Sequence, residues 1–434
     1  MPDVAFHPRQ VAQLLRDALA DSPVVLVHGP RQCGKTTLAQ WVGGPLGYDY
    51  LSFDDDTVRA AAEIDPVGFV DALPQLVILD EVQRVPALFT TLKHAVDRRR
   101  SPGRFLLTGS ANVLLLLPQL ADSLAGRMAL LRLHPLAQCE LAGQRSGFLD
   151  ALFQARFRSE RRERLGPRLA EAIVAGGYPT ALARPAGRRR RAWYRDYIEA
   201  LVQRDVRDLS RIHALDALPR LLAIAAAQTA QLFNVSDLAA PFQLSRPTIA
   251  DYVTLLERVF LLERLPPWYS NRISRLVKTP KLHLGDTGLA CALLGVDAAG
   301  LADDRTLLGH VLETFVFQEL RRQDSWADNP ADFFHYRDRD GVEVDIVIAR
   351  GARALAGVEV KAAATATARD FRGLEKLRAA TGERFAAGVL LYDGQATLSF
   401  GDRLFAVPIS ALWQAQRQTA DKEQQDVGPH WARL

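Results

Sequence analysis

Cysteine and long hydrophobic runs are scarce in this sequence, and each absence excludes a class of protein. The three cysteines, Cys33, Cys139 and Cys291, stand far apart and form no CxxC pair, so neither a disulfide framework nor a zinc site is indicated. No run approaches the ~20 apolar residues of a membrane-spanning helix. The N-terminus also lacks a basic segment followed by an apolar core. We therefore expect a cytoplasmic protein with no membrane partner.

Strong net charge is absent too, because the 434 residues carry a formal charge of only +4. A composition of 48% hydrophobic and 24% charged residues argues against disorder. At about 150 residues per domain, the length predicts two or three domains. The arginines are nevertheless clustered, within 156–164 and at 188–191. Such clusters suit either phosphate contacts or solvated helix faces, so charge alone does not choose between them.

The order of apolar patterns divides the chain into regions. From Pro23 to about Leu133, short β-rich runs alternate with helical segments, which predicts an α/β fold with parallel strands covered by helices. From Glu140 to Ser210 the pattern is helical and rich in arginine, interrupted by GGYP at 176–179. This stretch is expected to be a helical lid. From about Leu307, a helix followed by strands around a charged hairpin predicts a second α/β domain.

A phosphate-binding motif, GxxxxGK(S/T), follows the apolar run VVLVH and precedes a helix, as the motif requires. Backbone amides of such a loop cradle phosphate oxygens. Lys35 is expected to bridge the β- and γ-phosphates of ATP, and the hydroxyl of Thr36 to bind Mg²⁺. The predicted nucleotide-binding residues are Gly29, Pro30, Arg31, Gln32, Cys33, Gly34, Lys35, Thr36 and Thr37.

Acidic, polar and basic side chains follow the later strands of the same region. The run LVIL ends in Asp80, expected to hold Mg²⁺ through water, and Glu81, expected to be the general base. Ser110 follows the run RFLLTG and could position the attacking water. Arg127 precedes the next strand, from where its guanidinium could stabilise γ-phosphate charge in a neighbouring subunit. An intramolecular salt bridge is the alternative for Arg127.

These motifs resemble the AAA+ ATPases of bacteria and archaea that carry a winged helix and a C-terminal restriction-endonuclease-like domain. The matching stretches cover nearly the whole chain and include GPRQCGKTT, LVILDEVQR, LLTGSAN, SLAGR, GGYP, YIEALVQRDV, LGDTGLACALLG, LETFVFQEL and VEVKAA. The resemblance implies a nucleotide-driven homo-oligomer, with a hexamer as one arrangement, and it supports Arg127 as the trans-acting arginine. The substrate does not come with the fold.

Between Ser236 and Leu284 the order helix, turn, helix, strand, strand suits a winged helix-turn-helix. Arg246 and Thr248 fall in the exposed first turn of its recognition helix. The connection YSNRISRLVK is a candidate wing. It adds three basic residues suited to phosphate contact: Arg272, Arg275 and Lys278. Winged helices also dock proteins, so a protein partner stays open.

The last domain carries the spacing of the PD-(D/E)xK nucleases. Asp345 and Glu359 would hold Mg²⁺, Lys361 would orient the attacking water, and Glu313 could add a further acid. By resemblance this is the restriction-endonuclease-like core, whose plan the archaeal Holliday-junction resolvases share. The proline of the pattern is absent, since residues 341–345 read GVEVD. Active cleavage, DNA binding without cleavage, and mere charge alternation on exposed strands all remain open.

The sequence thus predicts five regions and one preferred function. The regions are an AAA+ P-loop core at 1–140, a helical lid at 141–212, a winged helix-turn-helix at 213–300, a nuclease-like domain at 301–414 and a polar tail at 415–434. The preferred function is an ATP- and Mg²⁺-dependent oligomer that binds and remodels DNA, with branched DNA such as Holliday junctions as a candidate. The alternatives are a nucleotide-dependent switch that recruits proteins and an ATP-dependent DNA nuclease.

Overall fold

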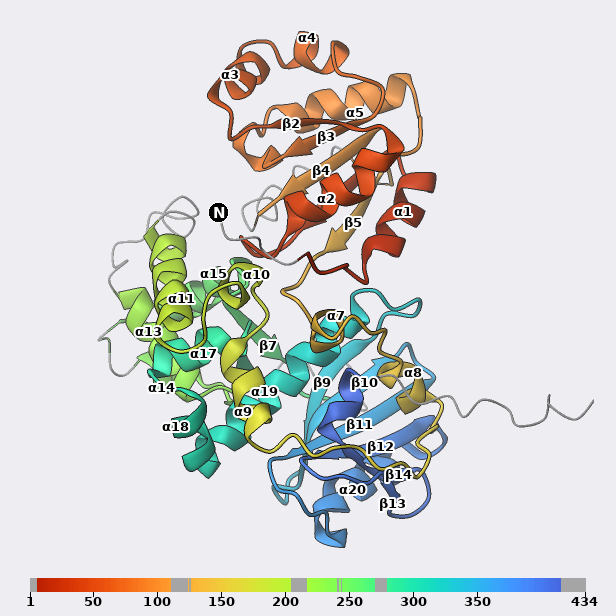
Figure 1. The fold of residues 1–434 in the computed structure, drawn as a ribbon, viewed down its shortest axis with the longest axis vertical. Helices are drawn as coiled ribbons and strands as arrows, with labels where there is room; N and C mark the ends of the chain where they lie inside the picture. Colours follow the sequence, from red (N-terminus) through yellow and green to blue (C-terminus); the bar gives the residue numbers. More distant parts are fainter. Residues whose placement is uncertain are drawn as a thin grey trace, which may run out of the picture.

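The computed structural model describes residues 6–110, 124, 126–203, 217–239, 242, 244–269 and 279–414. These residues form an N-terminal unit up to about residue 135, a middle unit from about 167 to 303, and a C-terminal unit from 305 to 414, at the top, left and lower right of Figure 1. None of the described helices is long and apolar enough to cross a membrane.

A five-stranded parallel sheet organises the N-terminal unit, in the order β2-β3-β4-β1-β5. Its strands are β1 (Val24–His28), β2 (Asp49–Ser52), β3 (Val77–Asp80), β4 (Phe105–Gly109) and β5 (Met128–Arg132). Its helices are α1 (Ala12–Asp21), α2 (Lys35–Gly43), α3 (Asp56–Ile64), α4 (Pro66–Asp71) and α5 (Leu88–Arg98). The predicted α/β fold with a parallel sheet is confirmed.

Burial on both faces explains the unbroken apolar strands of this sheet. All five residues of β1 are buried. Val24 and Leu26 pack into the hydrophobic cluster shared with α5, whereas Val25 and Val27 pack into the cluster shared with α1 and α2. Successive side chains of a strand point to opposite faces, so a strand between two helical layers must be apolar throughout. This arrangement leaves the carboxyl edge of the sheet free for polar side chains.

The middle unit combines helices with a small antiparallel sheet of order β6-β8-β7. Its first elements are α9 (Pro167–Ala175), α10 (Pro179–Leu182), α11 (Arg188–Leu201), α13 (Ala217–Ala227), β6 (Gln231–Leu232) and α14 (Val235–Ala239). Its later elements are α15 (Arg246–Arg258), β7 (Leu262–Leu265), β8 (Lys281–Leu284), α17 (Thr287–Leu294) and α18 (Ala298–Asp303). The Oγ of Ser245 accepts a hydrogen bond from the amide of Thr248 and so caps α15, as its position before the helix predicts.

A six-stranded mixed sheet forms the C-terminal unit, in the order β13-β14-β12-β11-β10-β9. The helices are α19 (Arg305–Asp324) and α20 (Arg372–Thr381), and the first strands are β9 (Asp332–Arg337), β10 (Glu343–Arg350) and β11 (Ala354–Lys361). The last strands are β12 (Phe385–Tyr392), β13 (Leu398–Ser399) and β14 (Leu404–Pro408). The charged hairpin expected from the sequence is the one between β9 and β10, which pair antiparallel.

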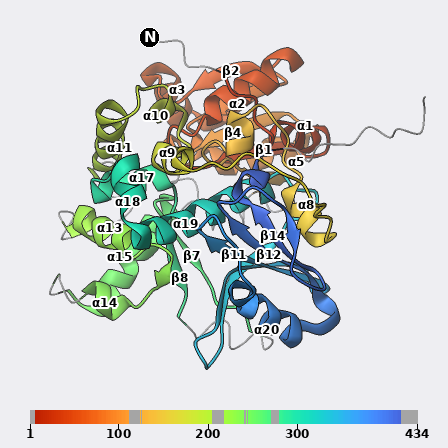
Figure 2. The ribbon, with the colours of Figure 1, turned by 60° about the horizontal axis from the view of Figure 1, so that its bottom comes forward.

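The segment expected as a lid is divided between two cores. α7 (Gln138–Leu141) and α8 (Phe148–Phe153) contribute Cys139, Leu149 and Leu152 to the hydrophobic cluster of the C-terminal sheet. α11 instead packs its aromatic face into the cluster of the middle unit. In Figure 2, α8 lies beside β12 and β14, away from α10 and α11. Each of these helices packs through its apolar face, so the segment is divided between the C-terminal and middle units.

Backbone pairing joins the middle and C-terminal units. After β7 the chain continues along the edge strand β9, where the amide of Trp268 donates to the carbonyl of His335 at 2.6 Å and that of His335 donates to Pro266 at 2.9 Å. Trp268 is buried in the cluster of β10 and α20. The helix α19 lies between the two sheets and has fourteen buried residues, many of them polar. The two units therefore share one continuous interior.

Candidate nucleotide site and acidic cluster

Glycine shapes the loop between β1 and α2. A Cβ atom on Gly29 would lie 2.1 Å from the carbonyl oxygen of Leu133, so only glycine lets the loop run this close to the chain after β5. Gly34 has a φ of +102° and directly precedes α2. The loop is thus folded tightly around the N-terminus of α2, where backbone amides can bind phosphate oxygens.

Lys35 and Thr36 lie where a nucleotide's phosphates and a magnesium ion would be bound. The buried Nζ of Lys35 donates to the carbonyls of Gly29 at 3.2 Å and Pro30 at 2.9 Å. The hydroxyl of Thr36 donates to Oδ1 of Asp80 at 2.9 Å. A hydroxyl beside a carboxylate is the kind of oxygen pair that Mg²⁺ prefers. The residues present therefore fit both ATP and Mg²⁺.

The other loop residues are held by their surroundings. Gln32 has a positive φ of +60°. The thiol of Cys33 lies 3.5 Å from the carbonyl of Leu133, and burial raises its pKa, so it packs as a neutral group. The carbonyl of Arg31 accepts a hydrogen bond from the hydroxyl of Tyr197 on α11 at 3.1 Å. The phosphate loop thus touches the middle unit directly.

Asp80 accepts three hydrogen bonds at the end of β3. Besides Thr36, the hydroxyl of Thr108 on β4 donates to Oδ1, and the hydroxyl of Tyr50 on the edge strand β2 donates to Oδ2 at 2.9 Å. Burial and the charge of Asp80 raise the pKa of Tyr50 to about 12, so the phenol stays protonated as a donor. Sequence reasoning predicts Asp80 but misses Tyr50 and Thr108, because only the register of the parallel strands brings them to the aspartate.

The side chain of Gln83 lies between Glu81 and Ser110 and bonds to both. The Nε2 of Gln83 donates to Oε2 of Glu81 and, at 3.0 Å, to Oγ of Ser110. Glu81 has a positive φ of +55°, which is uncommon for a residue with a side chain and typical of constrained sites. The structure therefore brings the predicted base and the predicted water-positioning residue together, through a glutamine that the sequence does not single out.

A cavity of about 240 Å³ adjoins the loop on the far side of α2. Its walls come from the N-terminal segment, α2 and the GGYP turn, and include Phe6, Thr37, Trp41 and Pro179. The rings of Phe6 and Trp41 meet edge to face, with their centroids 5.0 Å apart. Because Gly34 also lines this space, it is a candidate site for the nucleoside of a nucleotide whose phosphates occupy the loop.

Arg9, which the sequence analysis does not predict, connects the phosphate loop to the chain after β5. The residue is 8% exposed, and its guanidinium donates to the carbonyls of Cys33 at 2.8 Å and His134 at 2.6 Å, and to the carboxylate of Glu140 at 3.1 Å. No spacing rule connects an arginine before α1 with a glutamate in α7. The contact arises only when the chain after β5 folds back past the loop.

Arg127 lies at the amino-terminal end of the parallel strands, whereas the phosphate loop lies at their carboxyl end. Met128 pairs with Val24 at the start of β1, whereas Arg132 pairs with His28 beside the loop. At about 3.3 Å per residue, Arg127 is roughly 16 Å from the phosphate edge of its own chain. Its Nε donates to Asp97 on α5 at 2.6 Å. It therefore does not contact the nucleotide site of the same subunit, and its role in trans stays a prediction.

The DNA-binding residues predicted from the sequence are partly visible. Arg246 is exposed at the start of α15, and Thr248 takes part in the Ser245 cap. The inward face of α15 is apolar, with Ile249, Val253 and Leu256 fully buried. The remaining predicted contacts, Arg272, Arg275 and Lys278, lie outside the described residues.

The acidic residues of the nuclease pattern meet in one buried cluster. Asp345 on β10 accepts a hydrogen bond from the amide of Val360 at 3.0 Å and shares a second with the carboxyl of Glu359 on β11. Glu313 on α19 reaches the same place through Lys281, whose Nζ lies 2.7 Å from Glu313 and 3.2 Å from Asp345. Lys281 belongs to β8 of the middle unit and was not predicted.

Lys361 does not join this cluster by any described contact. Its Nζ lies 2.5 Å from Oδ2 of Asp370, which also accepts hydrogen bonds from the amide and hydroxyl of Thr367. Among the residues that the structure describes, no group of three or more histidine, cysteine or acidic side chains has an arrangement that could hold a metal ion. The residues present therefore do not fit the expected nuclease metal.

Charge within the cluster is unevenly divided. Burial and the charge of Asp345 raise the pKa of Glu313 and of Glu359 well above the usual range. Burial opposes ionisation of Asp345 as well, but the neighbouring Lys281 and the hydrogen bonds lower its pKa overall. At Lys281, burial alone would lower the pKa, but the nearby carboxylates of Glu313 and Asp345 outweigh that effect and raise it. The negative charge thus resides on Asp345, opposite a charged ammonium.

Comparisons with known proteins match the chain in three segments. An AAA domain matches residues 21–142, and two domains of unknown function, DUF8612 and DUF4143, match residues 166–300 and 308–412. Among solved structures, a Walker-type ATPase of Pyrococcus abyssi has 15% identity over 67% of this chain and 99% of that chain, with a TM-score of 0.44. The Thermotoga maritima RuvB Holliday junction branch migration motor has 18% identity over 60% and 91%, with a TM-score of 0.28.

Two curated relatives extend over nearly the whole chain. Uncharacterized proteins of Mycobacterium tuberculosis and Mycobacterium bovis are each 30% identical over 410 residues, which cover 93% of this chain and 84% of theirs. The AAA match and the geometry around Lys35, Thr36 and Asp80 agree on the chemistry of the N-terminal unit. The chain therefore belongs to the family of these mycobacterial proteins, and its N-terminal unit is an AAA P-loop ATPase domain.

Proposed function

We propose that the protein is an ATP-hydrolysing AAA+ oligomer that binds and remodels DNA through a winged helix-turn-helix in the middle unit, with branched DNA as the candidate substrate. The observation that carries the DNA part is the exposed first turn of α15. Arg246 points into solvent there, while the apolar face of the same helix is buried. A second helix presented in this way is the element that helix-turn-helix proteins place in the major groove.

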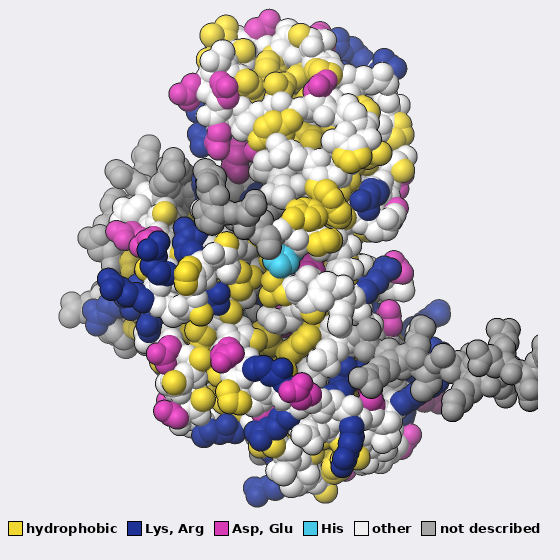
Figure 3. Space-filling view, viewed as in Figure 1, with side chains coloured by type: hydrophobic (Ala, Val, Ile, Leu, Met, Phe, Trp, Pro, Cys, Tyr) yellow, Lys and Arg dark blue, Asp and Glu magenta, His cyan; other side chains and the backbone are white. Residues whose placement is uncertain are grey.

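The element order of the middle unit supports this assignment. α13, β6, α14, α15, β7 and β8 follow one another as helix, strand, helix, helix, strand and strand, with the three strands in one sheet. The connection between β7 and β8 is where a wing would lie, and it carries the three predicted basic residues. Figure 3 adds that Lys and Arg side chains gather over this unit on the visible face.

Hydrolysis would follow from the polar edge of the N-terminal sheet. Mg²⁺, held by Thr36 and Asp80, would neutralise charge on the phosphates, and Lys35 would bind the terminal phosphate from the loop. Glu81 would take the proton of the attacking water. Gln83 and Ser110 would fix the position of Glu81 and of that water, because one amide group touches both side chains.

An oligomer would complete each site with an arginine from its neighbour. Arg127 is too far from the loop of its own chain, and β5, which follows it, is the edge strand of the sheet. Leu130 on this strand is 47% exposed. A packed neighbour would cover Leu130 and receive Arg127, once its ion pair with Asp97 opens.

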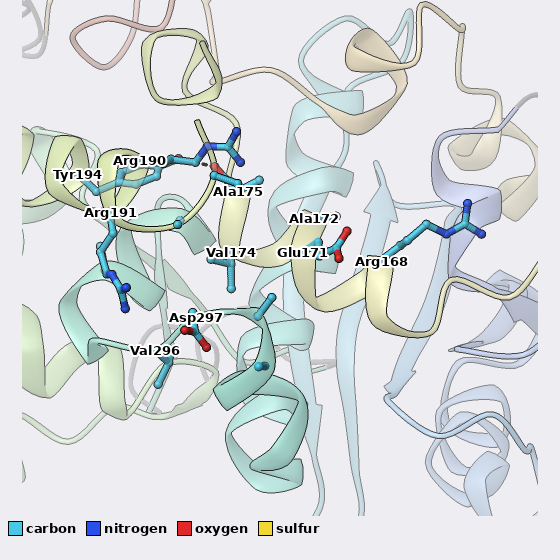
Figure 4. Close-up of a pocket in the computed structure, with 16 residues that line it drawn as sticks. Arg168, Glu171, Ala172, Val174, Ala175, Arg190, Arg191, Tyr194, Val296 and Asp297 are labelled. Carbon is cyan, nitrogen blue, oxygen red and sulfur yellow. Dashed lines mark hydrogen bonds between the residues drawn. The ribbon is translucent and has the colours of Figure 1, made fainter. Parts of the chain in front are cut away.

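A protein-recruiting switch is the second candidate, and one cavity favours it. About 710 Å³ of space lies between α9, α11, α17 and α18, with a mainly apolar lining. In Figure 4, Arg190, Arg191 and Tyr194 come from α11 and Ala172 and Val174 from α9 on its opposite side. A hollow of this size with a basic rim could accept a peptide segment.

DNA binding separates the two candidates. Fluorescence anisotropy with single-stranded, duplex, forked and four-way DNA should give salt-dependent binding, and Arg246→Ala should weaken binding to every sequence. Arg98→Ala, which removes an exposed arginine on α5 paired with Asp71, is the matched control and should leave binding unchanged. Replacing Arg272, Arg275 and Lys278 together should flatten the salt dependence. If wild-type protein binds none of these DNAs at low salt, with or without ATP, the switch becomes the better account.

A further inference from the structure

We infer that the acidic cluster of the C-terminal unit is an internal lysine site and not a metal site. The ammonium of Lys281, supplied by β8 of the middle unit, lies between Asp345, one of the two expected metal ligands, and Glu313, the expected further acid. The cluster then fastens the C-terminal unit to the middle unit. This inference does not depend on ATP hydrolysis or on DNA binding.

The geometry leaves little of the cluster for a metal. Lys281 contacts Glu313 at 2.7 Å and Asp345 at 3.2 Å, and its side chain is 4% exposed. The second oxygen of Asp345 accepts the amide of Val360 at 3.0 Å. A divalent ion binds carboxylate oxygens at about 2.0–2.6 Å. Any position that close to both acids would also lie against the ammonium and be repelled by it.

The main chain of Lys281 is not free to withdraw. β8 is the central strand of its sheet, and Lys281 pairs with Leu232 on one side and Leu265 on the other. Moving the main chain of Lys281 away from the cluster would therefore break its pairing with both neighbouring strands. Its buried side chain contacts the charged carboxylate of Asp345 and the carboxyl group of Glu313.

Neutral hydrogen bonds beside the lysine also join α19 to β8 and to the chain before β6. The hydroxyl of Thr314 on α19 bonds to the hydroxyl of Thr229 at 2.8 Å and to Nδ1 of His283 on β8 at 3.0 Å. All three side chains are fully buried. β8 and α19 therefore meet along a fixed line of contacts, and Lys281 reaches Glu313 because that line sets the register between them.

The residue that a nuclease would use to orient water is also engaged elsewhere. Lys361 binds Asp370, which belongs to the turn before α20. Lys281 and its acids thus form a buried, charge-paired set, whereas Lys361 and Asp370 form a partly exposed ion pair. Removing one partner of such a buried set leaves an uncompensated charge, whereas an exposed pair contributes little.

The test compares two lysines that each contact two acids. Lys281→Met removes the buried ammonium, and Lys376→Met removes a lysine whose side chain is 33% exposed and which contacts Asp338 and Asp340 on the β9–β10 hairpin at 2.5 and 3.0 Å. In nucleotide-free full-length protein, Lys281→Met should lower the Tm by more than about 5 °C, and Lys376→Met should not change it measurably. Equal Tm values for Lys281→Met and wild type would overturn the fastening role.

Manganese supplies the second readout, by electron paramagnetic resonance and by its effect on Tm. Wild type should show no Mn²⁺ binding that depends on Asp345, and its Tm should not rise with Mn²⁺. Lys281→Met should gain Mn²⁺ binding and recover part of its Tm, because the acids then lack a cation. Adding Asp345→Asn should abolish that gain. If Lys281→Met is too unstable to purify, Glu313→Gln, which keeps an acceptor for the lysine, takes its place and should still bind no Mn²⁺. Mn²⁺ binding by wild type that Asp345→Asn removes would overturn the inference.

Discussion

Arg322→Met should be among the most damaging single substitutions outside the nucleotide site. Arg322 lies on α19 and is 2% exposed. One guanidinium nitrogen donates to Asp286 at 2.9 Å, and the other to Glu319 at 2.7 Å and to the carbonyl of Leu136 at 3.0 Å. Both carboxylates have fully buried side chains. Methionine would fill much of the volume but leave two negative groups without their cation.

The size of the effect follows from those contacts. Breaking a buried ion pair costs about 3–5 kcal/mol, against a total stability of roughly 5–15 kcal/mol for a folded protein. Asp286 keeps the amides of Gly177 and Gly288 as donors, so the upper end of that range is not required. At about 2–4 °C per kcal/mol, Tm should fall on the order of 10 °C.

The assay is thermal unfolding followed by circular dichroism, with Arg168→Met as the control. Arg168 makes an equally short ion pair, 2.6 Å to Glu163, but both side chains are more than half exposed. Its loss should change the free energy of unfolding by less than about 1 kcal/mol. Adding Glu319→Gln to Arg322→Met should recover part of the lost Tm, because it removes one uncompensated charge. If Arg322→Met unfolds at the same temperature as Arg168→Met, the reasoning about buried charge is wrong here.

The other predictions concern catalysis and pH. Lys35→Ala should abolish tight ATP binding, whereas Glu81→Gln should keep binding and reduce kcat about 10²–10⁴-fold; a wild-type kcat for Glu81→Gln would contradict its role as the base. Arg127→Ala and Glu81→Gln, each inactive alone, should regain ATPase activity in mixed oligomers, and no recovery after verified subunit exchange would argue against action in trans. Tyr50→Phe should raise the Mg²⁺ concentration needed for half-maximal activity, because Oδ2 of Asp80 loses its donor; an unchanged Mg²⁺ dependence would exclude this positioning role. Burial lowers the pKa of His335 from 6.5 to about 4, so the unfolded chain gains a proton that the folded chain does not, and stability should fall as pH drops from 6.5 towards 4, by about 2 kcal/mol at pH 5. His335→Gln should show a smaller loss of Tm between pH 7 and pH 5 than wild type.

Short motifs at strand ends could be read from the sequence because their chemistry is local. Lys35 and Thr36 follow a strand by a fixed number of residues, and Asp80 ends another, so the parallel sheet alone brings them together. Asp345 could be listed as a candidate from the spacing of the nuclease pattern, and Glu313 as an acid on the helix before it. Their role could not be predicted, because it depends on Lys281, which lies on the short strand β8 of a different unit.

Long-range polar contacts were beyond the sequence for a physical reason. Arg9 bonds to Glu140, which is 131 residues away in the sequence, and neither residue lies in a motif that would predict this contact. In the sequence nothing distinguishes Tyr50 from other aromatic residues of edge strands. Only the register between β2 and β3 brings its hydroxyl to Asp80. Apolar periodicity reports which face of an element is buried, but it does not report which other element covers that face.

The distribution of apolar and polar contacts indicates where the molecule can move. Apart from Trp326, the clusters on both faces of the N-terminal sheet draw their described members from the N-terminal unit itself. Contacts from this unit to the rest include several polar ones, such as Tyr197 on the carbonyl of Arg31 and Arg322 on the carbonyl of Leu136.

The middle and C-terminal units are joined very differently, through α19, the Lys281 cluster and the pairing of β9 with the chain after β7. Polar interfaces between units permit relative motion more readily than shared apolar cores do. A change at the phosphate loop would pull on Tyr197 and on the GGYP turn, whose Gly177 amide is bound to Asp286 and, through it, to Arg322. We therefore expect a nucleotide-dependent change at the phosphate loop to reach the other two units through these polar contacts and not through a shared apolar core.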